Sequence, residues 1–392
     1  MVVFAYRLHG TLKALTPLHL GSGLTTGIIK HTKPFISGAV LRGVVGTIIM
    51  KAVCKHSRPR TDHESCEYFE NCVYARMFGE EFGKSSKVFF RFSYPLHLGC
   101  GGTFQPTPKT LHQCTNPQCK KLYDSFIPPK VCQCGFDVKP YQGYQCSGCE
   151  ALEKRPVRIS RITLTALDRQ KLSAAQVLGP NGEPYGTLHT LEVLERNSRF
   201  AFEILVFDDG DLVDIVKATI ERALPDEGIG GSKSRGLGKI AIEKIDVEEL
   251  DSSLVEKRAE ELDAKNFSIR LISPMVVQNG ELLTPEQLLE AARRAYTLVF
   301  RKGKPRLPKV EREGFKAVSY ERFSGWSLRY QRRRRIEPAL ASGSILQFKC
   351  EEPIKELALS LAALEYYAVG GYKPHGCGQI TIEPPRPVTL RV

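Results

Sequence analysis

Two glycine-rich loops occupy the same place in a repeated order of predicted elements, and this repetition constrains the fold more than any other sequence feature. The loop 228–238 follows a helix predicted over 212–224 and precedes a strand predicted over 239–247. The loop 369–378 also lies between a predicted helix and a predicted strand. Dinucleotide-binding folds and P-loop folds need the order strand, glycines, helix. The reversed order excludes both and indicates two copies of one architecture.

Each copy combines helices with strands that return beside one another, which is typical of a ferredoxin-like α+β unit. We predict two tandem domains of this kind, residues 1–247 and 266–392, with an insertion at about 100–156 in the first. The charged run 248–265 is interpreted as a solvated helical linker. Apolar periodicity predicts helices over 38–54, 212–224, 284–300 and 354–367, and strands over 199–207, 239–247, 267–277, 344–350 and 379–383.

The charge balance favours a polyanionic partner. The chain has 56 Lys and Arg against 43 Asp and Glu, a formal net charge of +13. Its longest apolar runs, 44–50 and 357–363, are far shorter than the ~20 residues of a membrane-spanning helix. The N-terminus lacks the pattern of a signal peptide, so we expect a cytoplasmic protein without membrane contact.

Cysteine spacing within the insertion predicts metal binding. The pattern is Cys-x4-Cys-x12-Cys-x-Cys-x11-Cys-x2-Cys, and two such pairs can close a tetrahedral Zn²⁺ site. Four thiolates leave no open coordination position, so we expect structural zinc. The predicted ligands are Cys114, Cys119, Cys132, Cys134, Cys146 and Cys149.

Three pairs for a four-ligand ion leave two arrangements open. Either one pair is idle, or the third pair joins Cys54, Cys66 and Cys72 in a second site, with His56 or His63 nearby. The remaining cysteines are interpreted as ordinary thiols: Cys100, Cys350 and Cys377.

A basic, aromatic stretch at 320–335 is typical of segments that hold single-stranded RNA, because bases stack on aromatic rings and guanidinium groups bind phosphates. The alternative is a solvated basic face whose aromatic side chains, Trp326 included, lie in the core. The RNA-binding residues predicted here are Trp326, Arg329, Arg332, Arg333, Arg334 and Arg335.

The two glycine-rich loops, with the segments 17–23, 37–43, 165–169 and 190–194, resemble the RAMP superfamily of CRISPR-associated proteins. Gly325-Trp326 followed by 341–345 looks like the second domain of two-domain RAMP subunits. The order of these motifs along the chain most resembles that of the type III-D effector subunit of the five-prime-tag-binding group. The resemblance implies paired RRM-like folds, a bound CRISPR guide RNA, and other type III effector subunits as partners.

In this family the glycine-rich loops contact the RNA backbone. Independently of the resemblance, such a loop exposes backbone N–H groups beside Lys233 and Arg235 and could bind phosphates, the alternative being a plain glycine-rich turn. The resemblance carries RNA contact onto Ser37, Arg42, Gly43, Gly230, Gly231, Lys233, Arg235, Gly236, Gly238, Gly371, Lys373 and His375.

Catalysis has weaker support in the sequence. Target-cleaving relatives carry an acidic residue between the first glycine turn and the helix, whereas residues 25–34 contain no Asp or Glu. His31, beside Lys30 and Lys33, or His375 could act as a general base, but no second acid or base is identifiable. We favour a loop histidine without chemistry for the first and a phosphate contact for the second.

The sequence therefore leads to a non-catalytic subunit that holds a CRISPR guide RNA near its 5′ tag in a type III effector. The first alternative is a metal-independent RAMP endoribonuclease that processes repeat RNA. The second, motivated only by the cysteines and the charge, is a zinc-ribbon protein of transcription or translation.

Overall fold

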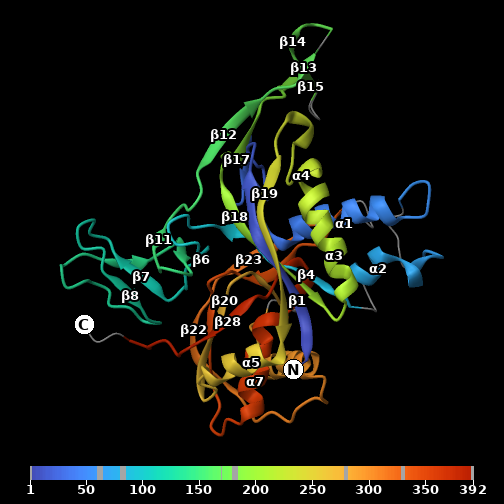
Figure 1. Cartoon of the computed structure of the whole chain (residues 1–392). Coiled ribbons are helices and arrows are strands. Elements are labelled where there is room, and N and C mark those ends of the chain that lie inside the picture. Colours follow the sequence, from blue (N-terminus) through green and yellow to red (C-terminus); the bar gives the residue numbers. More distant parts are fainter. Residues whose placement is uncertain are drawn as a thin grey trace.

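The computed structural model describes residues 2–59, 65–79, 85–168, 170–178, 184–277, 281–327 and 332–389 (Figure 1). The fold is α+β, with one main antiparallel sheet in each half of the chain, a projecting arm and a cysteine-rich module. No helix in these ranges is long and apolar enough to cross a membrane.

The main sheet of the first half has the strand order β19-β1-β18-β4, and all neighbours are antiparallel. β5 (Tyr94–Pro95) also pairs with β18. Leu8 and Ile204, which pair across β1 and β18, are buried on the face that packs against the helices. The elements in chain order are β1 (Val3–Ala14), α1 (Gly38–Val53), β4 (Val88–Phe90), β18 (Arg199–Phe207), α3 (Gly210–Ala218) and β19 (Ile240–Asp251).

The second half, from Ser252 onward, repeats this arrangement with the strand order β22-β27-β20-β28. Helix α6 begins at a capping box in which the Thr284 hydroxyl accepts from the Gln287 amide. Its elements are β20 (Asn266–Leu271), α6 (Pro285–Phe300), β22 (Glu311–Ala317), β27 (Ile345–Lys349), α7 (Lys355–Tyr367) and β28 (Ile380–Glu383).

The core of the second half also includes residues of the first sheet. Ile204 packs with the helices of the first half, whereas its neighbour Leu205 belongs to the core of the second half. Because successive strand residues point to opposite faces, β18 separates two hydrophobic cores. The first sheet therefore has helices on one face and the second half on the other.

The helices predicted over 38–54, 284–300 and 354–367 are confirmed as α1, α6 and α7. The helix predicted over 212–224 is divided, because a π-helical turn (Thr219–Ala223) separates α3 from α4 (Leu224–Glu227).

The charged segment 248–265 is not a solvated linker. Its first residues extend β19, and its helix α5 (Ser252–Glu260) buries Val255 and Ala259 in the core of the second half. The Arg258 guanidinium also pairs with Glu365 at 3.0 Å. Of its charged residues, Glu256, Lys257 and Glu260 are exposed on the outer face of this helix.

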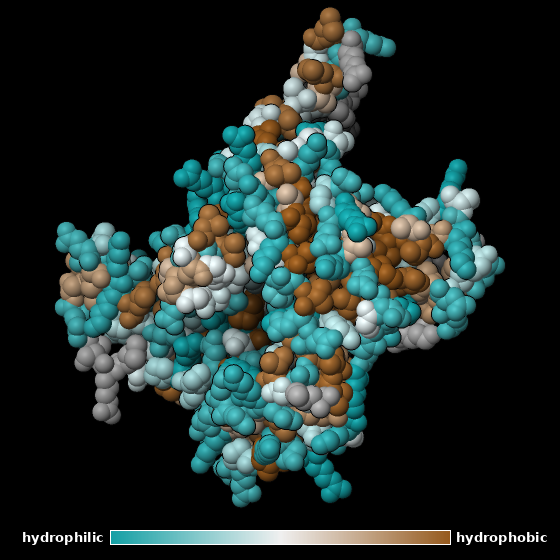
Figure 2. Space-filling view, viewed as in Figure 1, coloured by the Kyte–Doolittle hydropathy of each residue, from teal (hydrophilic) through white to brown (hydrophobic). Residues whose placement is uncertain are grey.

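A long arm projects from the first half (Figure 1). It is built on the sheet β12-β17-β3-β2 and ends in the hairpins β13–β14 and β15–β16. Leu167 and Leu172 are 70% and 90% exposed, and Figure 2 shows hydrophobic residues at the end of the arm. The arm strands are β2 (Gly21–Thr26), β3 (Ile29–Thr32), β12 (Ile159–Leu164), β13 (Leu167–Asp168), β14 (Ser173–Ala174), β15 (Gln176–Leu178), β16 (Pro184–Gly186) and β17 (His189–Leu194).

The predicted insertion forms a module of two small sheets between β5 and β12, which we call the cysteine module. One sheet has the order β11-β10-β6 and the other β8-β7-β9. Their strands are β6 (Phe104–Pro106), β7 (Leu111–Cys114), β8 (Leu122–Asp124), β9 (Val138–Pro140), β10 (Tyr144–Cys146) and β11 (Leu152–Glu153).

The basic stretch takes part in small sheets within the second half. Strands β21, β26 and β23 make one sheet, and β24 pairs with β25. Their bounds are β21 (Met275–Val276), β23 (Tyr320–Phe323), β24 (Trp326–Ser327), β25 (Arg332–Arg333) and β26 (Glu337–Leu340). A short helix, α2 (Val73–Phe78), follows α1 in the first half.

Candidate nucleic-acid interface and metal centres

The two glycine-rich loops follow the same backbone path. Each contains one turn of 3-10 helix, Lys233–Arg235 in the first loop and Lys373–His375 in the second. The residue before each turn is left-handed, with φ of 60° at Ser232 and 56° at Tyr372. The loops are therefore structural duplicates, as their shared position between helix and strand predicts.

Each loop is also tied to the extended segment that follows the first strand of its half. The four hydrogen bonds run from Gly231 N to His19 O (2.9 Å), Gly371 N to Val276 O (3.1 Å), Gly238 N to Pro17 O (3.0 Å) and Gly378 N to Pro274 O (2.8 Å). The loops are consequently rigid parts of each half.

These bonds correct the interpretation of the loops as rows of free backbone donors. The N–H groups of Gly231, Gly236 and Gly238 all donate to protein carbonyls. The glycines are needed for close approach instead, because a Cβ on Gly230 would lie 2.6 Å from the carbonyl oxygen of His19. Any phosphate contact at these loops must therefore use side chains or the remaining amides.

A cavity of about 1520 Å³ lies where the loops, the start of α1 and the basic stretch meet. We call it the central cavity. Residues of both halves line it, and many of them are predicted RNA-binding residues. Those that line it are Ser37, Arg42, Gly43, Gly230, Gly231, Lys233, Trp326, Arg334, Gly371, Lys373 and His375.

Other predicted residues do not line this cavity: Arg235, Gly236, Gly238, Arg332, Arg333 and Arg335. Arg235 contacts His189, the first residue of β17 in the arm, 3.0 Å from its Nε2. Arg332 and Arg333 are exposed on β25. Arg329 lies outside the described residues.

The cations around the cavity differ in how they are held. The Arg42 guanidinium donates to Phe78 O at 3.1 Å and to Ser86 Oγ at 3.2 Å, and it stacks 4.5 Å from the Phe78 ring. Burial lowers the pKa of Arg42 to about 10, which keeps it charged at neutral pH. Lys233 is neutralised by Glu227 at 2.6 Å.

The second loop contributes two half-buried basic residues. Burial, with Arg294 adding to it, lowers the pKa of Lys373 to about 7, and its ammonium lies 3.6 Å from the Tyr367 ring centroid. Burial, with Arg42 and Arg334 adding to it, holds the pKa of His375 well below its ordinary value. The His375 Nδ1 atom is buried without a hydrogen-bond partner among the described residues. His375 is therefore neutral in the ligand-free protein.

Aromatic rings complete the cavity wall. Trp326 is 56% exposed, so the alternative that places it in the core is wrong. Phe323 is buried against Tyr372 at 5.2 Å between centroids, and the Arg334 guanidinium lies 5.6 Å from the Tyr372 ring. Exposed aromatic faces beside guanidinium groups can stack unpaired bases and bind phosphates.

Several residues that line the cavity were not among the RNA contacts predicted from the sequence, and His19, Lys33 and Phe35 are three of them. His19 Nδ1 lies 2.8 Å from Glu192 O, which leaves its Nε2 as an acceptor. His19 belongs to the segment 17–23 and Phe35 lies two residues before the segment 37–43, so position in or near the family motifs was the available signal.

His31 lies on β3, outside the lining of the central cavity. Both of its ring nitrogens are engaged, Nδ1 with Glu192 Oε2 and Nε2 with Thr26 Oγ1, each at 2.9 Å. Glu192 also pairs with Arg161 at 3.3 Å. These contacts give His31 a structural role within the arm.

The first metal-ligand group consists of Cys114, Cys119, Cys132 and Cys134, and we call it the all-cysteine site. The sulfur atoms of Cys114 and Cys134 lie 3.4 Å apart, and those of Cys119 and Cys132 lie 3.7 Å apart. A tetrahedral zinc ion with Zn–S bonds of ~2.3 Å requires sulfur separations of ~3.8 Å. The donor set and its spacing therefore fit zinc.

Hydrogen bonds to sulfur support this assignment. The Asn116 amide donates to Cys114 Sγ at 3.4 Å, and the Tyr123 hydroxyl donates to Cys132 Sγ at 3.2 Å. The Cys134 amide, then the Tyr123 hydroxyl, lowers the pKa of Cys132 to about 6, whereas burial raises the pKa of Cys114 to about 12 when no metal is bound. Such donors stabilise thiolates, the form that ligates metal.

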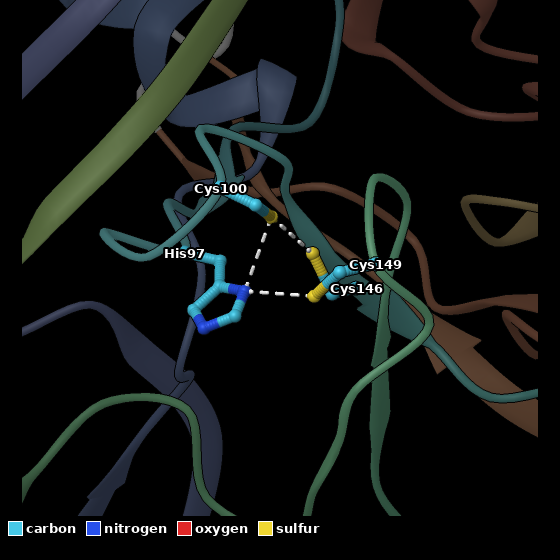
Figure 3. A group of neighbouring side chains, drawn as sticks. All are labelled: His97, Cys100, Cys146 and Cys149. Atoms are coloured by element: carbon cyan, nitrogen blue, oxygen red, sulfur yellow. Dashed lines mark hydrogen bonds between the residues drawn. The ribbon is translucent and has the colours of Figure 1, made fainter.

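The second group consists of His97, Cys100, Cys146 and Cys149, and we call it the histidine-containing site (Figure 3). His97 Nδ1 lies 3.2 Å from Cys100 Sγ and 3.3 Å from Cys149 Sγ. Cys100 Sγ lies 3.3 Å from Cys146 Sγ. This set also has the composition and compactness of a structural zinc site.

Both arrangements proposed for the third cysteine pair are therefore wrong. Cys146 and Cys149 are neither idle nor joined to Cys54, Cys66 and Cys72, and Cys100 is not an ordinary thiol. The signal was the matched spacing of His97-x2-Cys100 and Cys146-x2-Cys149.

The earlier cysteines form no metal-ligand group among the described residues. His56 Nε2 lies 3.3 Å from Cys66 Sγ. His63 lies outside the described residues.

Two sequence models of protein families match the chain. The RAMP superfamily matches residues 11–241, more than half of the 392 residues. A family described as CRISPR-associated protein (Cas_Cmr3) matches residues 238–384. No curated protein matches the sequence.

Solved structures give distant similarities. A chain of the type III-B Cmr-beta complex bound to cognate target RNA has a TM-score of 0.34 and 13% identity, covering 63% of this chain and 61% of that chain. This chain thus spans less than two thirds of that protein. A chain of a Cas6 product complex has a TM-score of 0.44 and 10% identity, covering 97% of this chain and 100% of that chain. Another Cmr-beta chain, from the complex with target RNA and AMPPnP, has a TM-score of 0.39 and 10% identity, covering 87% of this chain and 86% of that chain.

Proposed function

Because the chain belongs to the RAMP superfamily, we propose that it is a guide-RNA-binding subunit of a type III CRISPR effector that holds the guide near its 5′ tag. The observation that carries this proposal is the central cavity, in which both glycine-rich loops, the start of α1 and the basic stretch converge. Other effector subunits are the expected protein partners.

The strand orders support two ferredoxin-like, RRM-like units. Numbered within each half, both main sheets have the order four-one-three-two, with a helix after the first strand and another after the third. The duplicated glycine-rich loops occupy the same place in each unit, before its fourth strand. A pair of related units that meet at one cavity suits a ligand with repeated chemistry, such as a polynucleotide.

The dimensions and chemistry of the cavity favour a polymer over a metabolite. Its volume of about 1520 Å³ exceeds the roughly 300–1,000 Å³ of most small-molecule pockets. Arg42, Arg334 and Lys373 supply positive charge, and Trp326 and Tyr372 offer aromatic faces. Cations with stacking surfaces are the usual means of holding single-stranded RNA.

The endoribonuclease alternative is not favoured. His31, its first candidate base, lies outside the cavity lining and is held by Glu192 and Thr26. His375 lines the cavity, but its Nδ1 is buried. We therefore infer a binding role without RNA cleavage. The zinc-ribbon alternative loses its basis, because the cysteine module lies within the residues matched by the RAMP superfamily.

Zinc has a structural role in this proposal. Each site offers four protein ligands, so neither has a position left for water or substrate. When bound, zinc would cross-link the loops of a module whose buried apolar cluster around the all-cysteine site is very small.

The direct test is a binding assay with a labelled RNA that carries the 5′ tag, compared with the same RNA carrying a scrambled tag. We expect salt-sensitive binding with a preference for the tag and no cleavage. The variant R334E/K373E should bind at least about tenfold more weakly and reduce the salt slope by about 1.4, about 0.7 for each lost phosphate contact to a single strand. The control K265E/K355E makes the same change in net charge, but at exposed residues outside the cavity lining. Equal losses in both variants, or no tag preference, would contradict the proposal.

A further inference from the structure

The cysteine module contacts the C-terminal segment of the chain, which runs away from β28 toward β8 (Figure 1). The Phe126 amide donates to Pro387 O at 3.1 Å, and the Ile127 amide donates to Val388 O at 2.8 Å. Ile127 also forms a parallel bridge with Thr389. An insertion in the first half thus pairs, backbone to backbone, with the end of the second half.

A series of ion pairs with alternating charges reinforces this contact. Arg386 pairs with Asp124 at 2.7 Å and with Glu383, and Glu383 pairs with Arg270 at 3.2 Å. Arg270 then donates to Pro106 O at 2.8 Å, back in the module. The side chains of Arg270 and Glu383 are only 11% and 17% exposed. Charges that are this buried are costly to separate from their partners.

The segment that receives the C-terminus lies within the all-cysteine site. Asp124, Phe126 and Ile127 all fall between the ligands Cys119 and Cys132. Tyr123, beside Asp124 on β8, donates to Cys132 Sγ. Besides ligand cysteines, the apolar cluster described here consists of Tyr123 and Val138. So small a core gives the segment little apolar stabilisation, so metal ligation would add to the backbone pairing and ion pairs that hold it.

We propose that the all-cysteine site fastens the C-terminal segment 383–389, so that zinc occupancy holds the cysteine module against the second half. The inference needs zinc at this site and does not depend on the RNA-binding function. By thermodynamic linkage, the docked C-terminal segment must strengthen zinc retention by the same factor by which zinc strengthens docking.

The test measures, at equilibrium, the transfer of zinc from the full-length protein to a chelating dye. A variant that ends at Pro385 should hold one of two zinc ions more weakly, by about tenfold within the usual range of coupling. Arg386→Ala, which leaves every ligand in place, should shift zinc affinity in the same direction. The same truncation in a C119S/C134S background, which retains only the histidine-containing site, should leave the affinity for the remaining ion unchanged.

Hydrogen exchange provides a second readout. In C119S/C134S, the amides of Phe126 and Ile127 should lose protection. The amide of Lys109, which donates to Gly343 O at 2.8 Å outside the all-cysteine site, should keep it. Three results would overturn the proposal: no zinc at the all-cysteine site, zinc affinity unaffected by the truncation, or an equal loss of zinc affinity at both sites.

Discussion

Gly38, the first residue of α1, lies against the backbone of His375 in the second glycine-rich loop. A Cβ on Gly38 would come within 2.6 Å of the His375 carbonyl oxygen and 1.9 Å of the Phe90 carbonyl oxygen. A residue of the first half therefore approaches the second half at the wall of the central cavity, at a distance that only glycine permits.

Gly38→Ala should destabilise the protein by about 3 kcal/mol or more, because two backbone carbonyls cannot move aside for a methyl group. Gly43→Ala is the matched control on the same helix. A Cβ there meets nothing within 4 Å, so the change should be neutral or stabilise the helix by up to about 1 kcal/mol. Thermal unfolding of the two variants measures the difference. Equal melting temperatures would show that the halves do not meet as described.

The protein should bind two zinc ions, one per site. Cys134→Ser and Cys149→Ser should each remove one ion, because each takes one ligand from a different group of four. Cys377→Ser, a buried cysteine outside both groups, should keep both ions. Elemental analysis of purified protein gives the stoichiometry. Loss of both ions from either single variant would mean that the sites are not independent.

RNA affinity should fall as pH rises from 6 to 8. Burial lowers the pKa of Lys373 to about 7 in the free cavity, so it loses its proton across this range, whereas a bound phosphate favours the protonated form. The dissociation constant should therefore rise by up to about tenfold. Arg42 stays charged and His375 stays neutral over this range, because the pKa of the first is about 10 and that of the second is very low.

Lys373→Arg is the control for this pH dependence, since its guanidinium stays protonated. It should bind RNA with little change between pH 6 and 8. An equally steep profile in this variant would assign the titration to another group.

Trp326→Ala should weaken RNA binding by about 1–3 kcal/mol, the usual contribution of one stacked base, with little effect on stability. Trp326 is 56% exposed and lines the central cavity. Tyr320→Ala is the matched control, because Tyr320 is 55% exposed but does not line the cavity. Fluorescence anisotropy with labelled single-stranded RNA distinguishes them. Equal affinities would remove Trp326 from the binding surface.

His31→Ala should leave tag-RNA binding unchanged, because His31 is held within the arm by Glu192 and Thr26. Wild-type protein should leave repeat RNA intact over a long incubation. Gel analysis of end-labelled RNA checks both points. Cleavage that disappears in His31→Ala would restore the endoribonuclease alternative.

Elements with strong local signals were predictable from the sequence. The helix predicted over 38–54 is observed at Gly38–Val53, and the helix predicted over 284–300 at Pro285–Phe300. Their apolar spacing and, for α6, the Thr284 cap lie within the segment itself. The order helix, glycine-rich loop, strand was predictable for the same reason.

Two strands of the main sheets had no such signal. β4 contains only Val88–Phe90, and the charged β22, Glu311–Ala317, forms the edge of its sheet beside β27. A short strand and a mostly exposed edge strand show no clear alternation of apolar residues. Their places depend on pairing with β18 and β27, which are distant in sequence.

Of the two metal sites, one was predictable from the sequence and the other was not. The ligands of the all-cysteine site fall within 114–134, so their paired spacing was sufficient to propose them. The histidine-containing site joins His97 and Cys100 to Cys146 and Cys149, and the pairing of β6 with β10 brings these two segments together. Both ligand pairs of that site are present in the sequence, but the sequence does not show that they come together.

The sequence by itself determined the composition of the chain's parts: two similar units, a cysteine-rich insertion, glycine-rich loops after helices and an excess of positive charge. Only the tertiary structure decided that these parts meet at one cavity, with Gly38 against His375 and Arg334 over Tyr372. Periodicity, capping and ligand spacing act over a few residues and can be read locally. The cavity depends on contacts across hundreds of residues, which arise only when the two cores share the strand β18.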